Sequence, residues 1–135
     1  MIQITKQLAI FLENKPGVLA KVCGDLAKNS INILALTVSD TIDHTVLRMI
    51  VDKTDKAIHL LESTGAIVIE REVLLLDLPN KPGALEKIAS YLSAKKQNIE
   101  YIYCSANPKQ KNGSLVIRTS NVKKSYELLK QCKID

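Results

Sequence analysis

The 135-residue sequence has no tryptophan, one phenylalanine and four tyrosines, so a hydrophobic core must be built from aliphatic side chains. No apolar stretch approaches the roughly 20 residues that a membrane-spanning helix needs, and the first residues lack the layout of a signal peptide. The basic residues are not interleaved with aromatic ones, as stacking on nucleic-acid bases would require. We therefore expect neither a membrane nor a nucleic acid as partner.

Cysteine is also scarce, with residues 23, 104 and 132 as the only three. They show neither close pairing nor metal-ligand spacing, and an odd count without a secretion signal is typical of reduced thiols in the cytoplasm. We therefore expect a cytoplasmic protein. Cys23 and Cys104 fall on apolar faces and are expected to be small core residues.

The sequence lacks a recognisable catalytic constellation. His44 and His59 have no partner at nucleophile or metal spacing, and turn chemistry explains Asp40 and Asp43. The glycines of the chain form no phosphate-binding loop. We therefore predict no catalytic residue, no metal site and no cofactor, and a protein that is not an enzyme.

Charge is unevenly distributed between the two halves. Residues 1–66 carry 7 Lys or Arg and 7 Asp or Glu, whereas residues 67–135 carry 12 and 7. The basic residues are scattered or in short pairs, which favours a solvated surface over a binding patch for a large polyanion.

What the sequence does contain is a repeat. Asn14–Leu19 reads NKPGVL and returns 66 residues later as NKPGAL at Asn80–Leu85. The same offset relates Asn32-Ile33 to Asn98-Ile99 and, upstream, the apolar residues of 8–12 to those of 74–78. A register this long indicates a duplicated structural unit.

Hydrophobic periodicity within one copy predicts alternating strands and helices. The predicted strands are 8–12, 31–38, 46–51 and 66–69, and the predicted helices are 18–27 and 57–61. The polar residues 52–55 are expected to cap the second helix, and Gly65 is expected to close it. The order βαββαβ indicates a ferredoxin-like α+β unit, an antiparallel sheet with helices on one face.

The second copy repeats this order up to its last strand. We predict strands at 73–78, 98–106 and 114–119 and helices at 84–96 and 122–132. The predicted domains are therefore 1–70 and 71–135. Because the printed sequence stops where the second copy should begin its fourth strand, that strand is expected to be truncated, absent or borrowed, and an unpaired sheet edge favours a homodimer.

Each Asn-Lys-Pro-Gly segment precedes a predicted helix. Pro16 fixes φ and has no N–H to satisfy, while Gly17 permits a backbone conformation or a close approach that a Cβ would block. The first N–H groups of the helix lack intrahelical partners and carry the positive end of its dipole. They would stabilise a carboxylate, and the Asn14 amide can both donate and accept hydrogen bonds. These groups complement a free α-amino acid.

A second asparagine stands 18 residues after each loop asparagine, at positions 32 and 98. Both follow a predicted helix and begin a predicted strand. Asparagine also terminates helices and tolerates left-handed conformations, so a purely local role remains open for this pair. Likewise, Asn14 and Asn80 can act as caps or loop braces rather than as ligand contacts.

The loops, the order of elements and the downstream asparagines together resemble a tandem pair of ACT domains, small-molecule-sensing modules of amino-acid metabolism. Residues 37–48 further resemble a group of short bacterial proteins that consist only of two such domains. The resemblance implies sheets joined edge to edge and a ligand in the groove between paired domains. The implied ligand-binding residues are Asn14, Lys15, Pro16, Gly17, Val18, Leu19, Asn32, Ile33, Asn80, Lys81, Pro82, Gly83, Ala84, Leu85, Asn98 and Ile99.

In serine-sensing members of that family, the loop asparagine of one domain and the strand-start asparagine of the other hold the ligand. If the halves of one chain pair by their second strands, Asn14 is expected near Asn98, and Asn80 near Asn32. Those members also carry a histidine where this sequence has Leu12 and Leu78. An amino acid more apolar than serine is therefore the expected ligand.

The resemblance implies a non-enzymatic, amino-acid-binding regulatory protein that acts by shifting an assembly equilibrium. Three alternatives remain open. One is a detached regulatory subunit of a biosynthetic enzyme such as acetolactate synthase, which would make that enzyme a partner. The second is a purely structural dimerisation module, and the third is an enzyme with an unrecognised site.

Overall fold

The computed structural model describes residues 1–40 and 44–134, and their contacts divide the chain into two units. The first unit is Lys6–Arg71, and the second combines Met1–Thr5 with Glu72–Asp135. These bounds differ from the predicted domains 1–70 and 71–135 in two respects: the first five residues belong to the second unit, and Arg71 belongs to the first. The expected turn at 41–43, which includes Asp43, lies outside the described residues.

Within these described residues, ten elements follow one another in the order βαββαβ and then αββα. They are β1 Ile2–Glu13, α1 Val18–Lys28, β2 Ile33–Asp40, β3 His44–Val51, α2 Thr54–Ser63, β4 Ile67–Pro79, α3 Ala84–Ala94, β5 Ile99–Ser105, β6 Asn112–Thr119 and α4 Val122–Lys130. The predicted strands 66–69 and 73–78 are one continuous strand, β4, and each of the other predicted elements is present with shifted ends. Strands β1 and β4 are longer than predicted because each contributes residues to both units.

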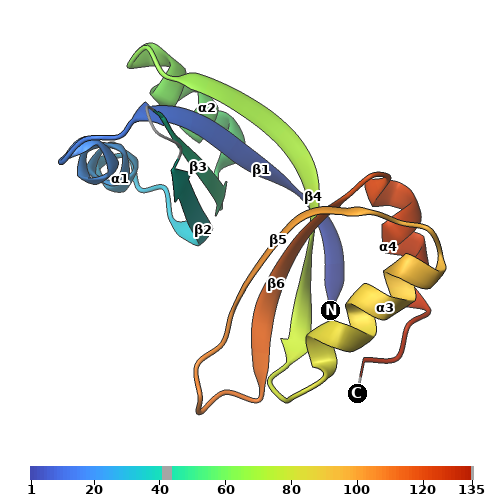
Figure 1. Ribbon diagram of the computed structural model, residues 1–135. Helices are drawn as coiled ribbons and strands as arrows, with labels where there is room; N and C mark the ends of the chain where they lie inside the picture. Colours follow the sequence, from blue (N-terminus) through green and yellow to red (C-terminus); the bar gives the residue numbers. More distant parts are fainter. Residues whose placement is uncertain (41–43, 135) are drawn as a thin grey trace. The chain divides into compact units, whose positions relative to one another are not determined.

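In the first unit the strand order is β2-β3-β1-β4. Antiparallel pairing sets Leu8 opposite Met49 and Ile10 opposite Leu47, so these buried side chains share one face of the sheet. Helices α1 and α2 cover that face (Figure 1) and add Val22, Leu26, Ala57 and Leu61 to the aliphatic core.

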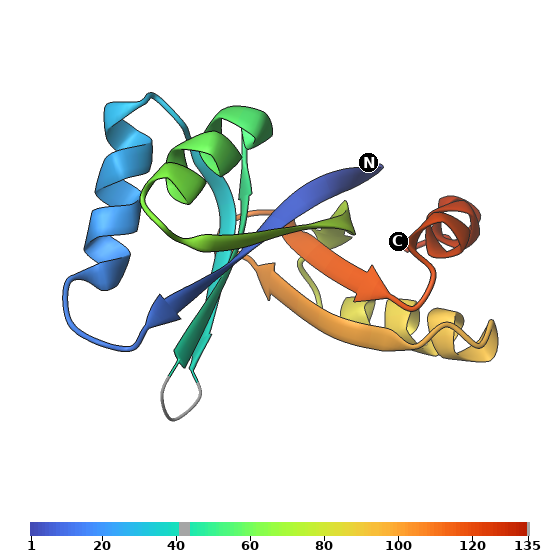
Figure 2. The same ribbon diagram turned by 90° about the horizontal axis from the view of Figure 1, so that it is seen from above.

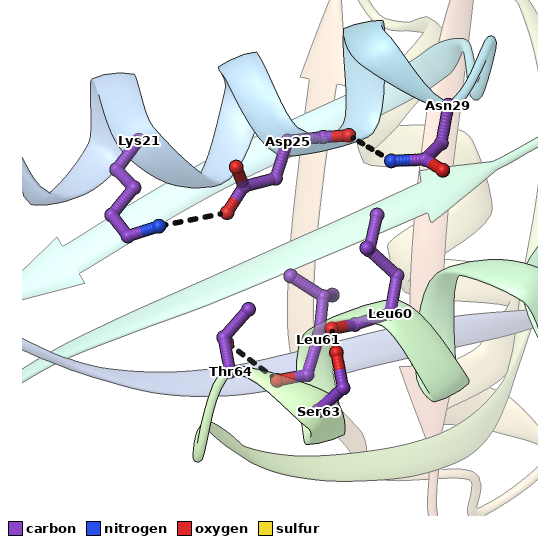
Figure 3. A network of polar contacts seen from close by, with 7 residues as sticks. All are labelled: Lys21, Asp25, Asn29, Leu60, Leu61, Ser63 and Thr64. Atoms are coloured by element: carbon purple, nitrogen blue, oxygen red, sulfur yellow. Dashed lines mark hydrogen bonds and ion pairs between the residues drawn. The ribbon is translucent and has the colours of Figure 1, made fainter.

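Polar contacts complete the helices of the first unit. On α1, Lys21 pairs with Asp25 at 3.2 Å and the Asn29 amide donates to the Asp25 carbonyl at 2.9 Å (Figure 3). At the end of α2, the Thr64 hydroxyl donates to the Leu61 carbonyl, and Gly65 follows with φ 88°. The predicted closing role of Gly65 is thus confirmed, because a left-handed residue is what ends such a helix.

The predicted cap of α2 is wrong. The N-cap residue is Lys53, and no side chain caps the helix. The Asp52 carboxylate instead accepts a hydrogen bond of 2.9 Å from the Asn32 backbone N–H. The Asp52 carboxylate, expected to cap the helix, thus accepts from the backbone just before β2 instead.

In the second unit the strand order is β1-β4-β6-β5, in the same register as the first. Leu74 lies opposite Ile117 and Leu76 opposite Leu115. These side chains share a core with residues of α3 and α4, the two helices of this unit (Figure 2). Ile2 and Ile4 pack against this core, and the Asp77 N–H donates to the Met1 carbonyl at 3.0 Å. The strand that 71–135 lacks is therefore supplied by the amino-terminal end of β1.

Candidate functional site

The loops before α1 and α3 have the same backbone conformation. Gly17 and Gly83 are the N-cap residues, with φ of 88° and 89°, in the left-handed region that side chains disfavour. A Cβ built on either glycine would meet no atom within 4 Å. The glycines are therefore required by the backbone angle, and the space beside them is open.

No side chain caps α1 or α3. By contrast, the Asn121 side chain at the start of α4 accepts a hydrogen bond from the Lys124 N–H at 3.1 Å. The first N–H groups of α1 and α3, at the positive end of each helix dipole, therefore have no capping side chain. They are available to bind a ligand carboxylate.

Each loop lines a pocket inside its own unit. The first-unit pocket has a volume of about 190 Å³ and is lined by Leu12, Glu13, Asn14, Lys15, Val18, Leu19, Val38 and Thr45. The second-unit pocket has a volume of about 450 Å³ and is lined by Leu78, Pro79, Asn80, Lys81, Pro82, Gly83, Ala84, Leu85, Glu86, Cys104, Ser105, Ala106 and Gly113. The two linings occupy corresponding positions of the repeat.

Two corrections concern the apolar lining. Leu19 belongs to the apolar stripe of α1 but is 41% exposed, beside the first-unit pocket rather than in the core. Cys104 was expected to be buried but is exposed. It lies opposite the buried Leu115 and shares its face of the sheet, yet it stands on the edge strand where the pocket opens.

Sequence reasoning missed several lining residues of the second-unit pocket: Pro79, Glu86, Cys104, Ser105, Ala106 and Gly113. Glu86 and Gly113 stand where the first unit has Ala20 and Thr45. A Cβ on Gly113 would lie 2.5 Å from the Ser105 carbonyl oxygen, so the strands can approach only because this residue is glycine. Aligning the third strands of the two copies would have marked this position.

The loop asparagines differ in their bonding. The Asn80 amide donates to the carbonyls of Asn107 and Gln110, at 3.0 and 2.9 Å, and so fastens the β5–β6 connection. Its side-chain oxygen is left as an acceptor. The Asn14 side chain makes no hydrogen bond within the described residues.

The strand-start asparagines lie at the other end of each unit. Strands β1 and β2 both run antiparallel to β3, so the start of β2 is remote from the loop that ends β1. The same holds for β4 and β5 beside β6. Asn32 and Asn98 accordingly line neither pocket, and Ile33 and Ile99 pack against the cores.

Asn32 and Asn98 do not terminate the preceding helices. The left-handed residues after α1 and α3 are Ser30 and Lys96, with φ of 57° and 59°. The backbone N–H groups of Asn32 and Asn98 instead donate to the side-chain oxygens of Asp52 and Ser120, and their carbonyls accept from the backbone N–H groups of the same two residues. Their side chains are exposed and are not needed to end a helix.

The expected pairing of second strands within one chain is wrong. Strands β2 and β5 stand at the two ends of the strand order, and each has a single neighbour, β3 or β6. The two central strands of that order, β1 and β4, are neighbours instead. Asn14 cannot therefore meet Asn98 through a β2–β5 ladder of the same chain.

The described residues contain no group of three or more His, Cys, Asp or Glu side chains that could hold a metal ion. None of their helices is long and apolar enough to cross a membrane. Both histidines, His44 and His59, are exposed.

Comparison with known proteins decides the family. The family described as ACT domain pair matches residues 3–135. This chain belongs to that family. The ACT domain pair is a regulatory fold, and two units with helices on one face of an antiparallel sheet are its architecture.

Solved structures agree with this assignment. Protein BT0572 from Bacteroides thetaiotaomicron is 42% identical over 99% of this chain and 92% of its own, with a TM-score of 0.91. The ligand-free regulatory subunit of aspartate kinase from Thermus thermophilus is 18% identical over 96% of this chain and 95% of its own, with a TM-score of 0.71.

Aspartokinase III from E. coli, solved in complex with lysine and aspartate, is 17% identical over 96% of this chain and 32% of its own, with a TM-score of 0.55. At these identities the two aspartate kinases show a shared fold alone. Among curated proteins, none matches the chain.

Proposed function

We propose that this ACT domain pair is a non-enzymatic regulatory protein that binds a free amino acid at its Asn-Lys-Pro-Gly loops. The observation that carries the proposal is the pocket in each unit where a helix N-terminus without a side-chain cap faces open space beside a left-handed glycine. The helix N–H groups would take the ligand carboxylate, and the asparagine oxygen would accept from its ammonium group.

A second copy of the chain is proposed to complete the site. Strands β2 and β5 each have one sheet neighbour, and an edge strand with free N–H and C=O groups is a template for pairing. Three apolar side chains along β2, Leu34, Leu36 and Val38, are 56%, 38% and 42% exposed. Within one unit, Asn32 or Asn98 is remote from the Asn-Lys-Pro-Gly loop. Pairing at these edges would bring the Asn32 or Asn98 of a second copy towards that loop.

The proposed output is a change in assembly. A ligand that binds the paired state more tightly than the unpaired state shifts the equilibrium towards pairing. A partner enzyme bound to the protein would respond to that change in assembly. A detached regulatory subunit is the second candidate, because the structurally similar protein from Thermus thermophilus is a regulatory subunit of aspartate kinase.

A thermal-shift screen of the purified protein against the twenty amino acids tests the proposal. An amino acid at 100 times its Kd should add about 2.7 kcal/mol to the free energy of unfolding. If no amino acid changes the melting temperature at millimolar concentration, the sensor function is wrong and the structural dimerisation module is favoured.

Light scattering tests the assembly. We expect a dimer or larger species at micromolar protein, whose population changes with the amino acid that the screen identifies. A strict 14.9 kDa monomer from micromolar to millimolar protein would contradict the proposed pairing. Co-purification of a larger enzyme subunit would select the second candidate instead.

A further inference from the structure

We propose that the two pockets are not equivalent: the second-unit pocket binds a free α-amino acid with an apolar side chain of about leucine size, and the first-unit pocket binds none. This inference rests on the proposed function and assigns it to one half of the chain. It follows from the size, the charge and the lining of the two pockets.

Size separates the pockets first. Small-molecule sites typically enclose about 300–1,000 Å³. The second-unit pocket, at about 450 Å³, lies inside that range, whereas the first-unit pocket, at about 190 Å³, falls below it. The first-unit pocket has less than half the volume of the second, and so offers less room for a ligand side chain.

Three substitutions within the repeat account for the difference. Where the first-unit pocket is lined by Val18, Val38 and Thr45, the second has smaller residues. These are Ala84, Cys104 and Gly113. Each replacement removes side-chain atoms from the wall. Together they make the wall beside Leu78 and Leu85 wide enough for an apolar ligand side chain, and we assign the size selectivity to them.

Charge separates the pockets as well. In the first-unit pocket, Lys15 and Glu13 form an ion pair of 3.1 Å and so neutralise each other. In the second, proline replaces that glutamate at position 79, and Lys81 forms no ion pair within the described residues. Lys81 is therefore available for a carboxylate at the start of α3.

The second-unit pocket also carries its own carboxylate. Glu86 lies in the first turn of α3, where the first unit has Ala20, and it accepts a hydrogen bond only from the Ser90 hydroxyl among the described residues. A cation and a carboxylate that do not pair with each other complement a zwitterion. Lys81 joins the helix N–H groups in binding the ligand carboxylate, and Glu86 is the charged acceptor for its ammonium group beside the Asn80 side-chain oxygen.

Isothermal titration of the full-length protein with glycine, L-serine, L-valine, L-leucine and L-methionine tests stoichiometry and size. We expect L-leucine or L-methionine to bind tightest, with one ligand per chain. Two equal sites per chain, or tighter binding of glycine than of L-leucine, would overturn the inference. If none of the five binds and the wider screen is also negative, the proposed function itself fails.

Matched substitutions locate the site. Lys81→Met should weaken L-leucine binding roughly tenfold or more, which corresponds to about 1.4 kcal/mol, whereas Lys15→Met should leave it unchanged. Both lysines are exposed, so both variants should fold. Loss of binding in Lys15→Met with retention in Lys81→Met would place the ligand in the first unit, which overturns the inference and keeps the proposed function.

Ligand analogues test the role of Glu86. For the unmodified protein, 4-methylpentanoate, which lacks the ammonium group of leucine, should bind roughly tenfold or more weakly than L-leucine. In Glu86→Gln that preference should disappear, because the carboxylate that recognises the ammonium is gone. An unchanged preference in Glu86→Gln would remove Glu86 from the site. Cys104→Val, which installs the first-unit residue, should shift selectivity from L-leucine towards smaller amino acids.

Discussion

Three corresponding buried positions differ in chemistry between the two units. The first unit has Ile31, Val51 and Ala57 in its core. The second has Gln97, Thr119 and Ser125, which are equally buried. The Ser125 hydroxyl lies 2.6 Å from that of Thr119 and donates to the Gln97 side-chain oxygen at 3.3 Å.

The same three backbone positions thus accept either apolar or polar side chains, provided that the polar side chains hydrogen-bond to one another. No described buried side-chain N or O atom lacks a hydrogen-bond partner, so the desolvation penalty of the polar trio is met. What the duplicated scaffold holds constant is the burial of a position and its register, and not its polarity.

The largest expected effect concerns how strongly the units are coupled. Leu8→Ala should lower the free energy of unfolding by about 2–5 kcal/mol, because Leu8 is fully buried in the first core. All four tyrosines, residues 91, 101, 103 and 126, lie in the second unit and report on it alone. Because β1 and β4 belong to both units, tyrosine fluorescence and far-UV circular dichroism should shift to the same lower urea midpoint.

Leu74→Ala, the equivalent change in the second core, is the control and should behave alike. A tyrosine midpoint that stays in place in Leu8→Ala would show that the units unfold independently despite the strands they share.

The next effect tests the polar trio. Ser125→Ala should cost about 1–3 kcal/mol, because it leaves Thr119 and Gln97 buried without their common partner. Replacing all three by the first-unit residues, as Gln97→Ile, Thr119→Val and Ser125→Ala together, should cost less than the single change. Urea denaturation measures both, and a triple variant less stable than Ser125→Ala would contradict the equivalence of the two trios.

A smaller effect tests the loop backbone. Gly17→Ala and Gly83→Ala should each cost about 1–2 kcal/mol, because both residues are left-handed, although an added Cβ meets no atom. Gly24 lies inside α1, where an added Cβ also meets nothing, so Gly24→Ala should stabilise by about 0.5–1 kcal/mol. If thermal melts show that Gly17→Ala and Gly83→Ala are as stable as Gly24→Ala, backbone strain is excluded as the reason for glycine at positions 17 and 83.

The smallest expected effect separates the two loop asparagines. Asn80→Ala removes two hydrogen bonds to backbone carbonyls and should cost about 1 kcal/mol at this exposed site. Asn14→Ala should change the free energy of unfolding by less than about 0.5 kcal/mol. Hydrogen exchange should rise in the β5–β6 connection of Asn80→Ala, and equal stability losses in the two variants would argue against the different bonding of these asparagines.

The repeat and the hydrophobic periodicity predicted the order of elements, because local patterns set both. Val22 and Leu26 recur as Ile88 and Leu92 on corresponding helices, and all four are buried. Periodicity could not show that Leu19, on the same apolar stripe, lies beyond the core beside a pocket. That placement depends on how far each strand extends past the helix.

Strand pairing was the harder part, because it joins residues far apart in the sequence. Nothing local to Ile2 and Ile4 indicates that they complete a sheet with residues after 71. The bonding of Asn80 was equally hidden, since its partners lie in an irregular connection with no repeat to align. The loop motif itself, with its positive φ at glycine, was readable because few residues adopt that conformation.

The place of residues 1–5 in the second unit has a consequence for the order of events on the ribosome. The rest of that unit begins at Glu72, so at about 5–20 residues per second its synthesis starts roughly 3–14 s later. The contiguous segment Lys6–Arg71 is complete when that interval ends, and it can close its sheet while the rest of the second unit is still being made. Residues 1–5 are therefore made well before the unit that they complete, and a chaperone or a fusion that occupies them would delay the second unit and spare the first.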